Sequence, residues 1–248
     1  MELIINGGSG RMGHILTEKI SAMESCSVAA LVSPDWTENE DEKKYTSIEH
    51  FNGKSDCVID FSNHVATVSL LEWCKKKKIP VVVATTGHTS EEKQLIADAA
   101  NDIPVFYSAN MSVGIAVIAN LAKQAAAMFP DADIEIIEKH HNKKLDVPSG
   151  TALLLAAELE SVRNEAELVI GRHENGQRKK SEIGIHSIRL GNEVGTHEII
   201  ISTGNETLTI KHEAENRTLF ADGAITAAEF LQGKPNGLYS MKDILKAR

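Results

Sequence analysis

The sequence predicts an α/β fold with two domains, a first domain built on a parallel sheet and an α+β domain with an open mixed sheet. Short apolar segments alternate with helix-like segments through residues 1–111, as in a parallel sheet wound by right-handed crossovers. Between residues 183 and 211, strand-like segments follow one another without helices, which favours a separate α+β domain. A helix-like segment from residue 220 is expected to pack back on the first domain. The first domain therefore takes residues 1–111 and 217–248, and the second takes residues 112–216.

The expected elements follow from apolar periodicity and turn residues. In the first domain we expect strands at 3–6, 28–32, 56–62, 79–83 and 103–107. The helices are expected after the glycine turn, from residue 14 to about 23, and at 65–78 and 91–101, with a polar loop and a short helix at 36–53. In the second we expect a helix at 115–129, a strand at 134–138, a helix from 151 to about 159, and strands at 183–189, 195–201 and 207–211.

Composition excludes several classes of protein. With 248 residues, of which 42% are hydrophobic and 25% charged, the chain can bury a core in one or two domains. The net charge of −9 argues against a nucleic-acid partner. The three cysteines are odd in number and widely spaced, so we expect no disulfide framework, no metal and a reducing compartment. No apolar run reaches the ~20 residues that cross a bilayer, and no signal peptide is expected, so the prediction is a cytoplasmic protein without a membrane partner.

A glycine-rich turn joins the first strand to the first helix. Its spacing, Gly7-x-x-Gly10-x-x-Gly13, allows a tight turn and lets the backbone approach a pyrophosphate at the helix N-terminus. A glycine trio alone is weak evidence, but the strand–turn–helix context is that of a Rossmann-like dinucleotide-binding domain. The residues expected to contact the cofactor here are Gly7, Gly8, Ser9, Gly10, Arg11 and Met12.

The position that usually reads the ribose, at the end of the second strand, holds Ser33, Pro34 and Asp35. Asp35 is either a ligand of the ribose hydroxyls or the acid of a Pro-Asp turn, and we prefer the turn. Neither a carboxylate nor a guanidinium directly follows the strand. We therefore expect dual use of NADH and NADPH, with Arg11 and Ser33 tilting the balance slightly toward NADPH.

Residues 138–152 read Glu-x-His-His-x-x-Lys-x-Asp-x-Pro-Ser-Gly-Thr-Ala and carry the richest chemistry. The Pro-Ser-Gly-Thr turn precedes an Ala/Leu-rich helix, whose first N–H groups can bind a carboxylate. Histidine, and lysine in suitable surroundings, can exchange protons near neutral pH. A metal site at His140 and His141 is disfavoured, because adjacent side chains point apart and no further ligand follows at zinc spacing. Lysines in such a run are otherwise ordinary surface charges.

Taken together, this segment resembles the signature of the 4-hydroxy-tetrahydrodipicolinate reductase family. The glycine turn in the form Gly-x-x-Gly-Arg-Met-Gly and a later His-x-Ala-x-x-Arg at 212–217 agree with it, so the resemblance covers essentially the whole chain. It implies reduction of 4-hydroxy-tetrahydrodipicolinate to tetrahydrodipicolinate with NAD(P)H, in diaminopimelate and lysine biosynthesis. It also implies a homotetramer assembled through the second-domain sheet.

The resemblance assigns roles to individual residues. His140 becomes the proton donor/acceptor and Lys144 the second proton donor. The residues implied to hold the dicarboxylate substrate are His141, Ser149, Gly150, Thr151 and Arg217. Ser33 is implied at the ribose side of the cofactor, and those implied on its nicotinamide side are Ala84, Thr85, Thr86, Gly87, Ser108, Ala109, Asn110 and Met111. Met111 stands where the family usually has an aromatic residue, and a core methionine is an equally good interpretation.

Two other classes of function remain as alternatives. A semialdehyde dehydrogenase would need a nucleophilic cysteine, but Cys57 lies in an apolar strand and Cys74 among helix residues. A redox-sensing dinucleotide binder would explain the glycine turn, but not His140, Lys144 and the Ser-Gly-Thr turn. Such a sensor would leave a pocket for pyridine-2,6-dicarboxylate empty.

Overall fold

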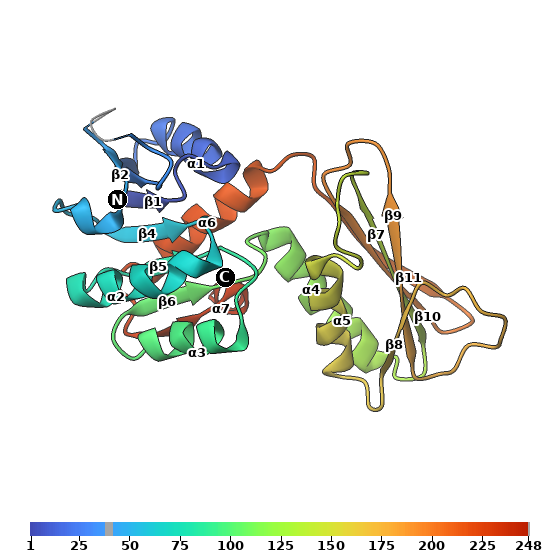
Figure 1. Cartoon of the computed structure of the whole chain (residues 1–248). Coiled ribbons are helices and arrows are strands. Elements are labelled where there is room, and N and C mark those ends of the chain that lie inside the picture. Colours follow the sequence, from blue (N-terminus) through green and yellow to red (C-terminus); the bar gives the residue numbers. More distant parts are fainter. Residues whose placement is uncertain (38–41, 248) are drawn as a thin grey trace. The chain divides into compact units, whose positions relative to one another are not determined.

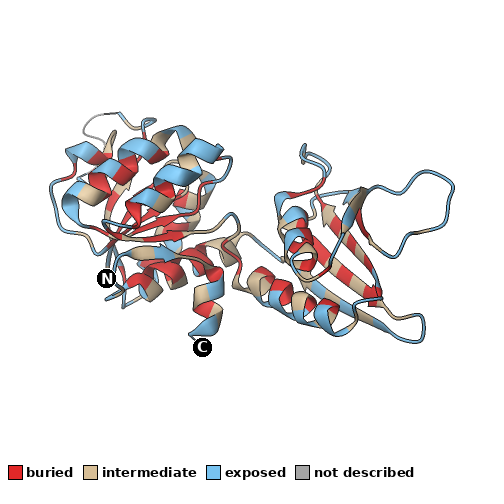
Figure 2. Cartoon of the chain, turned by 90° about the horizontal axis from the view of Figure 1, so that it is seen from below, coloured by how far each residue is buried: buried red, intermediate tan, exposed pale blue. Residues whose placement is uncertain are grey.

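The chain forms two compact units in a computed structural model that describes residues 1–37 and 42–247 (Figure 1). The first unit comprises Met1–Ser112 and Thr218–Arg248, and the second comprises Val113–Arg217. Each boundary lies one residue after the boundary expected from the sequence. The buried residues gather on the strands of each sheet and on the helix faces that pack against them (Figure 2).

In the described part of the first unit, seven strands form one sheet in the order β12-β6-β5-β4-β1-β2-β3, and every pair is parallel. The strands are β1 (Glu2–Asn6), β2 (Ser27–Val32), β3 (Lys44–Tyr45), β4 (Cys57–Asp60), β5 (Val81–Val83), β6 (Pro104–Tyr107) and β12 (Gly237–Tyr239). The helices are α1 (Arg11–Ser21), α2 (Thr67–Lys77), α3 (Ser90–Ala99), α6 (Thr218–Leu231) and α7 (Met241–Lys246), with short 3-10 turns at Ile48–His50 and His64–Ala66.

The order of this sheet positions a ligand site. Strand β1 is central and pairs with β2 on one side and β4 on the other, so the winding of the chain reverses there. Helices α2 and α3 cover one face and α1 and α6 the other (Figure 1). Because both faces are covered, β4 is buried along its whole length and reads as an apolar run. In such sheets a ligand binds at the carboxyl ends of the strands beside this reversal.

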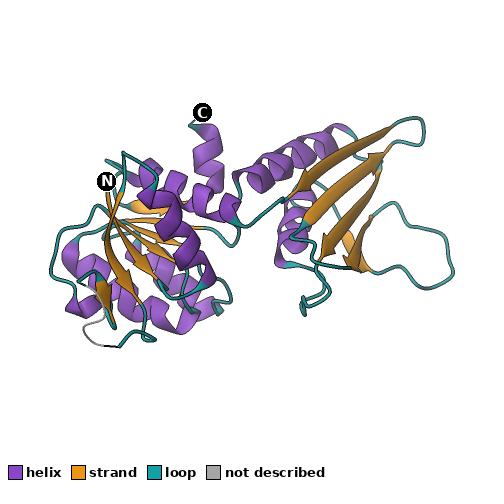
Figure 3. Cartoon of the chain, turned by 90° about the horizontal axis from the view of Figure 1, so that it is seen from above, coloured by secondary structure: helices purple, strands orange, loops and turns teal. Residues whose placement is uncertain are grey.

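The second unit is described throughout, and its five strands form a mixed sheet in the order β11-β10-β7-β9-β8. These are β7 (Asp133–His140), β8 (Glu167–Ile170), β9 (Glu182–Arg189), β10 (Thr196–Ser202) and β11 (Thr207–Glu213). β7 and β8 run parallel to β9, whereas β10 is antiparallel to β7 and β11. Two helices, α4 (Val113–Met128) and α5 (Gly150–Glu160), lie on one face, and no helix of this unit lies over the other (Figure 3).

Alternation along β7 decides which side chains meet the helices. Ile134, Ile136, Glu138 and His140 are buried, while the residues between them are more exposed. The first two belong to the core that α4 and α5 share with the sheet. Glu138 and His140 therefore continue the core face of β7 to its carboxyl end, close to the start of α5.

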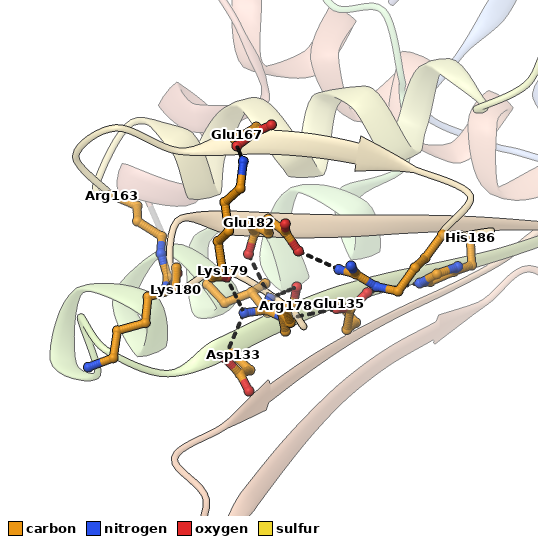
Figure 4. A network of polar contacts seen from close by, with 11 residues as sticks. Asp133, Glu135, Arg163, Glu167, Arg178, Lys179, Lys180, Glu182 and His186 are labelled. Atoms are coloured by element: carbon orange, nitrogen blue, oxygen red, sulfur yellow. Dashed lines mark hydrogen bonds and ion pairs between the residues drawn. The ribbon is translucent and has the colours of Figure 1, made fainter. Parts of the chain in front are cut away.

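The open face of the sheet carries a network around Arg178, which lies between β8 and β9 (Figure 4). Its guanidinium donates to the carboxylates of Asp133 at 2.6 Å and Glu135 at 3.2 Å. It also donates to three main-chain carbonyls, those of Ile134, Lys179 and Glu182. This arginine thereby ties the β8–β9 connection to the sheet.

A glycine makes room for the same network. Gly184 on β9 lies opposite Glu135 in the register, and a Cβ at Gly184 would overlap the Glu135 carboxylate. That carboxylate lies over the strand and also contacts His186 Nε2 at 2.8 Å. A side chain at position 184 would therefore displace Glu135 from both of its partners.

The expected strands and helices of both units are present, with ends shifted by a few residues. The sequence did not predict β3, β8, β12 or α7, which are short and lie at sheet edges or near the end of the chain. Edge strands pack on fewer neighbours, so their apolar pattern is weaker. Within the loop expected at 36–53, β3 and the turn at Ile48–His50 are present, and residues 38–41 lie outside the described residues.

Candidate active site

A glutamate and a histidine form a close pair at the carboxyl end of β7. His140 Nδ1 lies 2.5 Å from Glu138 Oε2. The Glu138 side chain is fully buried, and that of His140 is only 11% exposed. They lie two positions apart on the strand, so their side chains leave the same face and meet without distortion.

Arg189 at the end of β9 binds the other side of this carboxylate. The register pairs Arg189 with His140, and its two terminal nitrogens reach Glu138 at 2.8 and 2.7 Å. The amide of Ser149 donates to the same carboxylate at 3.2 Å. Burial alone would raise the pKa of Glu138, but hydrogen bonds from His140 and Arg189 outweigh it and hold the pKa well below its usual range. Glu138 is therefore ionised at neutral pH.

A second buried histidine packs against the first. His197 on β10 lies opposite Glu138 in the register, and its ring stands edge-on to that of His140, with centroids 5.2 Å apart. Its Nε2 lies 3.2 Å from Ser149 Oγ. Burial, and then the nearby charge of His140, lower the pKa of His197 to about 3. His197 is therefore neutral near pH 7. On another side of His140, a Cβ at Gly195 would lie 3.0 Å from Nε2, so the glycine leaves that nitrogen uncrowded.

The loop after β7 carries the second candidate proton donor. Lys144 Nζ pairs with Asp146 at 2.9 Å, and the Lys144 amide donates to the His141 carbonyl at 3.1 Å, which folds the loop into a turn. Burial, followed by the positive charge of Arg217, lowers the pKa of His141. Arg217 therefore places a positive charge near His141. The buried Nδ1 of His141 has no hydrogen-bond partner in the described chain.

The start of α5 offers an anion site beside this loop. Ser149 is the N-cap residue, and its side chain accepts a hydrogen bond from the Ala152 amide. Gly150 and Thr151, between these two residues, carry the first two amides of the helix. Gly150 is exposed, and a Cβ there would have nothing within 4 Å among the described atoms. Amides at a helix start in open space bind carboxylates well. Ser149 itself is buried, so its side chain supports this helix start rather than reaching a ligand.

In the first unit, the glycine turn has the geometry of a phosphate site. The amides of Gly7 and Gly8 both donate to the Val32 carbonyl at 2.9 Å, and Gly7 has a positive φ of 86°. A side chain at Gly13 would overlap the backbone of the turn, which explains the third glycine. The N-cap of α1 is Gly10, without a side-chain cap, so the helix start can receive a pyrophosphate. Arg11, the first residue of α1, is exposed.

Asp35 is hydrogen-bonded to the glycine turn, in addition to lying in a turn of its own. Its carboxylate accepts from Ser9 Oγ at 2.7 Å and from Ser33 Oγ at 3.3 Å, while the two serine hydroxyls lie 2.6 Å apart. Asp35 is exposed and lies in a turn after β2. The Pro34-Asp35 turn is therefore present. The Asp35 carboxylate also lies at the position that commonly binds the ribose hydroxyls.

The segments expected at the nicotinamide follow β5 and β6. Thr85 is buried and bonds Asp60 at 2.7 Å, so its hydroxyl is used within the unit, whereas Thr86 and Gly87 are exposed. Ser108 Oγ donates to the Asn110 carbonyl at 2.6 Å and shapes the next turn. The Met111 side chain is only 2% exposed, which favours the interpretation as a core methionine. Contact of residues 84–87 and 108–111 with a cofactor stays a prediction.

The thiols needed by a semialdehyde dehydrogenase are not suited to attack. Cys57 and Cys74 are fully buried, and burial raises the pKa of both. Over residues 1–37 and 42–247, no group of three or more His, Cys, Asp or Glu side chains could hold a metal ion. Across the same residues, the helices are too short or too polar to cross a membrane.

Sequence reasoning found His140, His141, Lys144 and the start of α5, but missed the partners that hold them. It missed the role of Glu138, although Glu and His two apart on a strand must share a face. It also missed Arg189, His197 and the pairing of Asp146 with Lys144. Arg189 and His197 carry no local signal, because only the register of β9 and β10 against β7 brings them in.

The fold and these two sites define a nucleotide-binding oxidoreductase, and comparison with known proteins identifies its family. Models of "Dihydrodipicolinate reductase, N-terminus" and "Dihydrodipicolinate reductase, C-terminus" match residues 1–111 and 114–245. The chain therefore belongs to the dihydrodipicolinate reductase family.

Relatives of known name agree along the whole length. The 4-hydroxy-tetrahydrodipicolinate reductase of Caldanaerobacter subterraneus subsp. tengcongensis is 44% identical, over 99% of this chain and 98% of the relative. That of Clostridium tetani is 42% identical, over 100% and 98%. A solved dipicolinate-bound dihydrodipicolinate reductase from Paenisporosarcina sp. TG-14 shares the fold, with a TM-score of 0.81 at 24% identity over 97% of each chain.

Proposed function

We propose that this chain reduces 4-hydroxy-tetrahydrodipicolinate to tetrahydrodipicolinate with a pyridine nucleotide, in diaminopimelate and lysine biosynthesis. Its membership of the family and the names of its relatives support the reaction. The observation in the structure that carries it is the Glu138–His140 pair beside the start of α5. A proton donor next to a carboxylate site suits a cyclic dicarboxylate substrate.

The residues of the second unit divide into binding and proton transfer. The amides of Gly150 and Thr151, together with His141 and Arg217, hold the two carboxylates of the substrate. A guanidinium suits a planar carboxylate because it can donate two parallel hydrogen bonds. Binding both carboxylates fixes the ring, which keeps the carbon that is reduced and the ring nitrogen in defined places.

Reduction requires protons as well as hydride. Loss of water from C4 of the substrate leaves a conjugated imine, to which a reduced nicotinamide, when bound, would supply hydride. Addition of hydride places negative charge on the ring-nitrogen side, where a proton donor must lie within reach. His140 Nε2, on the side of the ring away from Glu138, exchanges one proton. Lys144, held in its loop by Asp146, donates the second.

The cofactor is a pyridine nucleotide bound by the residues of the glycine turn, and dual use of NADH and NADPH stays our proposal. The carboxylate of Asp35, linked to Ser9 and Ser33, favours NADH because it accepts from ribose hydroxyls and repels a 2′-phosphate. Arg11 at the start of α1 attracts that phosphate. Each exposed charge contributes about 1 kcal/mol or less, so the two cofactors should differ within roughly tenfold.

We further propose that the open face of the five-stranded sheet assembles the chain into a homotetramer. Ile188 on that face is 42% exposed, and Ile137 and Ile200 are partly exposed. Exposed sheets of this kind are commonly covered by another chain. Light scattering should give the mass of four chains, and a stable monomer would contradict this proposal.

A coupled assay tests the reaction and the cofactor together. A dihydrodipicolinate synthase supplies the substrate, and nicotinamide oxidation is followed with NADH and NADPH at one ionic strength. We expect turnover with both, and Asp35→Asn should move the ratio of kcat/KM toward NADPH, whereas Asp98→Asn on the exposed side of α3 should leave it unchanged. Absence of turnover together with no binding of pyridine-2,6-dicarboxylate would favour a redox sensor. A ratio above about a hundredfold, or ~2.7 kcal/mol, would contradict dual use.

A further inference from the structure

We propose that Glu138 and Arg189 are positioning residues of this site, which fix the ring hydrogen of His140 on Nδ1 and tune how readily Nε2 gains and releases a proton. The inference rests on the proposed function for its catalytic meaning. It concerns residues to which neither the sequence pattern nor the family comparison gave a role.

The first step is the tautomer of His140. An ionised carboxylate only accepts hydrogen bonds, so the hydrogen between His140 Nδ1 and Glu138 Oε2 belongs to the imidazole. In the neutral ring, Nε2 then carries the lone pair. This nitrogen lies on the side where Gly195 presents no side chain. A carboxylate behind a histidine fixes the tautomer and the ring orientation in the same way in many sites.

The second step is the charge on the carboxylate. An isolated buried carboxylate would hold a proton on the adjacent imidazole too firmly for exchange. The guanidinium of Arg189 binds both oxygens of Glu138, at 2.8 and 2.7 Å, and so offsets that charge. Glu138 and Arg189 therefore act on His140 with opposite sign. Their balance, rather than either charge alone, sets the proton affinity of Nε2.

Arg189 also connects the pair to the loop of the second proton donor. Its Nη2 donates to the Asp146 carbonyl at 2.8 Å, and the carboxylate of Asp146 pairs with Lys144. One guanidinium thus contacts the elements that carry His140 and Lys144. The Ser149 amide, at the start of α5, binds the same Glu138 carboxylate. The dicarboxylate-binding helix start and both proton donors are anchored to one ion pair.

Other titratable groups surround His140 and must be considered with this pair. They are His197 on β10, His212 on β11, and His141 and Lys144 on the following loop, with Arg217 acting on His141. Burial lowers the pKa of His197 to about 3, so it does not compete for a proton near neutral pH. The positive charges of Lys144 and Arg217 act with Arg189 and against Glu138. Removal of either member of the ion pair should therefore change the titration of His140.

The open face of the same sheet provides a matched control. Glu135 on β7 binds His186 at 2.8 Å and Arg178 at 3.2 Å, which repeats the Glu–His–Arg combination without contact to the proposed substrate groups. A Glu135→Gln variant changes charge on the same strand, in a place where no proton transfer is proposed. It should leave the titration of His140 and the pH profile of kcat unchanged.

The experiment compares Glu138→Gln, Arg189→Met and Glu135→Gln in the full-length chain. The His140 ring is followed by NMR, assigned with His140→Gln, and kcat is measured against pH. Glu138→Gln should move the midpoint of the His140 titration down by about one pH unit or more, and Arg189→Met should move it up. Each should lower kcat about 10- to 100-fold, the range typical when the carboxylate behind a functional histidine is lost. Shifts in one direction for both variants, or no shift in either, would overturn the proposal.

Conservative variants guard against loss of the fold. Glu138→Asp and Arg189→Lys keep the charges, so they should keep the midpoint closer to wild type than the neutral variants do. If the neutral variants do not fold, the proposal requires that Glu138→Asp lower the midpoint of the His140 titration slightly and that Arg189→Lys raise it slightly. A midpoint that is unchanged in both variants overturns the proposal. A purely structural role would lower kcat in all four variants without moving the midpoint. If the wild type shows no turnover, the proposed function fails, and the NMR midpoints still decide this inference.

Discussion

The same three residue types occur twice on opposite faces of the sheet around β7 and β9, although the arginine of one group lies in the connection that precedes β9. The inner group, beside α5, is Glu138, His140 and Arg189, and the outer group, on the open face, is Glu135 and His186 with Arg178 (Figure 4). The inner glutamate and histidine are 0% and 11% exposed, and the outer ones 27% and 36%. The chemistry is therefore alike and the surroundings differ.

That difference separates a site for proton transfer from a structural tie. The two arginines are alike in exposure, at 17% and 18%, so the difference lies in the glutamate and the histidine. In the inner group Glu138 is fully buried, so its charge acts strongly on its neighbours and breaking the pair leaves it uncompensated. In the outer group, water screens the charges of the partly exposed Glu135 and His186. Arg178 serves chiefly to bind three main-chain carbonyls and hold the β8–β9 connection. Burial, rather than residue type, decides which role the combination takes.

The largest expected effect is on turnover, and it separates the two histidines. His140→Gln should lower kcat by ~10²–10⁴-fold with little change in KM, because it removes help given in the transition state. His186→Gln should leave kcat within a factor of about three, since no proton transfer is proposed there. Steady-state kinetics of both variants decide this. Similar losses in both would mean that the two groups do not differ in function.

The two arginines should differ in stability. Arg189→Ala leaves the buried Glu138 without its main counter-charge, so the free energy of unfolding should fall by ~3–5 kcal/mol. Arg178→Ala loses contacts that are partly exposed to water, and the fall should be ~1–2 kcal/mol. Urea denaturation at neutral pH measures both. Equal losses would contradict the assignment of the outer group as the weaker one.

Lys144 and Arg217 should affect different quantities, the first turnover and the second the binding of a dicarboxylate. Lys144→Ala should slow turnover by ~10²-fold with little effect on the binding of pyridine-2,6-dicarboxylate. Arg217→Ala should weaken that binding by ~1.5–3 kcal/mol, because a charge-assisted hydrogen bond is lost. Calorimetry with the inhibitor and steady-state kinetics distinguish the two roles. Unchanged inhibitor affinity in Arg217→Ala would exclude the carboxylate-binding role.

The smallest effect expected is a pH dependence of stability due to His197. Its pKa is lowered from 6.5 to about 3 on folding, so between these values the unfolded chain binds a proton that the folded chain does not. Stability should therefore fall as pH decreases below 6.5, by ~1–2 kcal/mol at pH 5. The depressed pKa of Glu138 adds a further loss that begins only below about 4.5. Denaturation of wild type and His197→Gln at pH 7, 6 and 5 tests this. The variant should lose less stability than wild type over this range, and the part that remains comes from His88, His141 and His212, whose pKa values are also lowered.

Much of the fold could be read from local patterns. The glycine turn, the alternation of strands and helices, and the order Glu-x-His-His-x-x-Lys were visible because each depends on residues close together in the chain. The edge strand β8 was not predicted, since its four residues are partly exposed and lack a clear period. Asp35 could not be assigned either, because its bond to Ser9 depends on how two separate turns meet.

Local sequence patterns were enough to show which chemical groups are available. These are a glycine turn for a dinucleotide, two histidines and a lysine for protons, and a helix start for a carboxylate. Which of these groups act together depends on how the chain folds. The register that sets His197 opposite Glu138 and Arg189 opposite His140 joins residues far apart in the chain. The alternation of β7 then buries Glu138 and leaves Glu135 partly exposed. Backbone conformation is set largely by neighbours in sequence, whereas register and burial arise only when distant strands pair and exclude water.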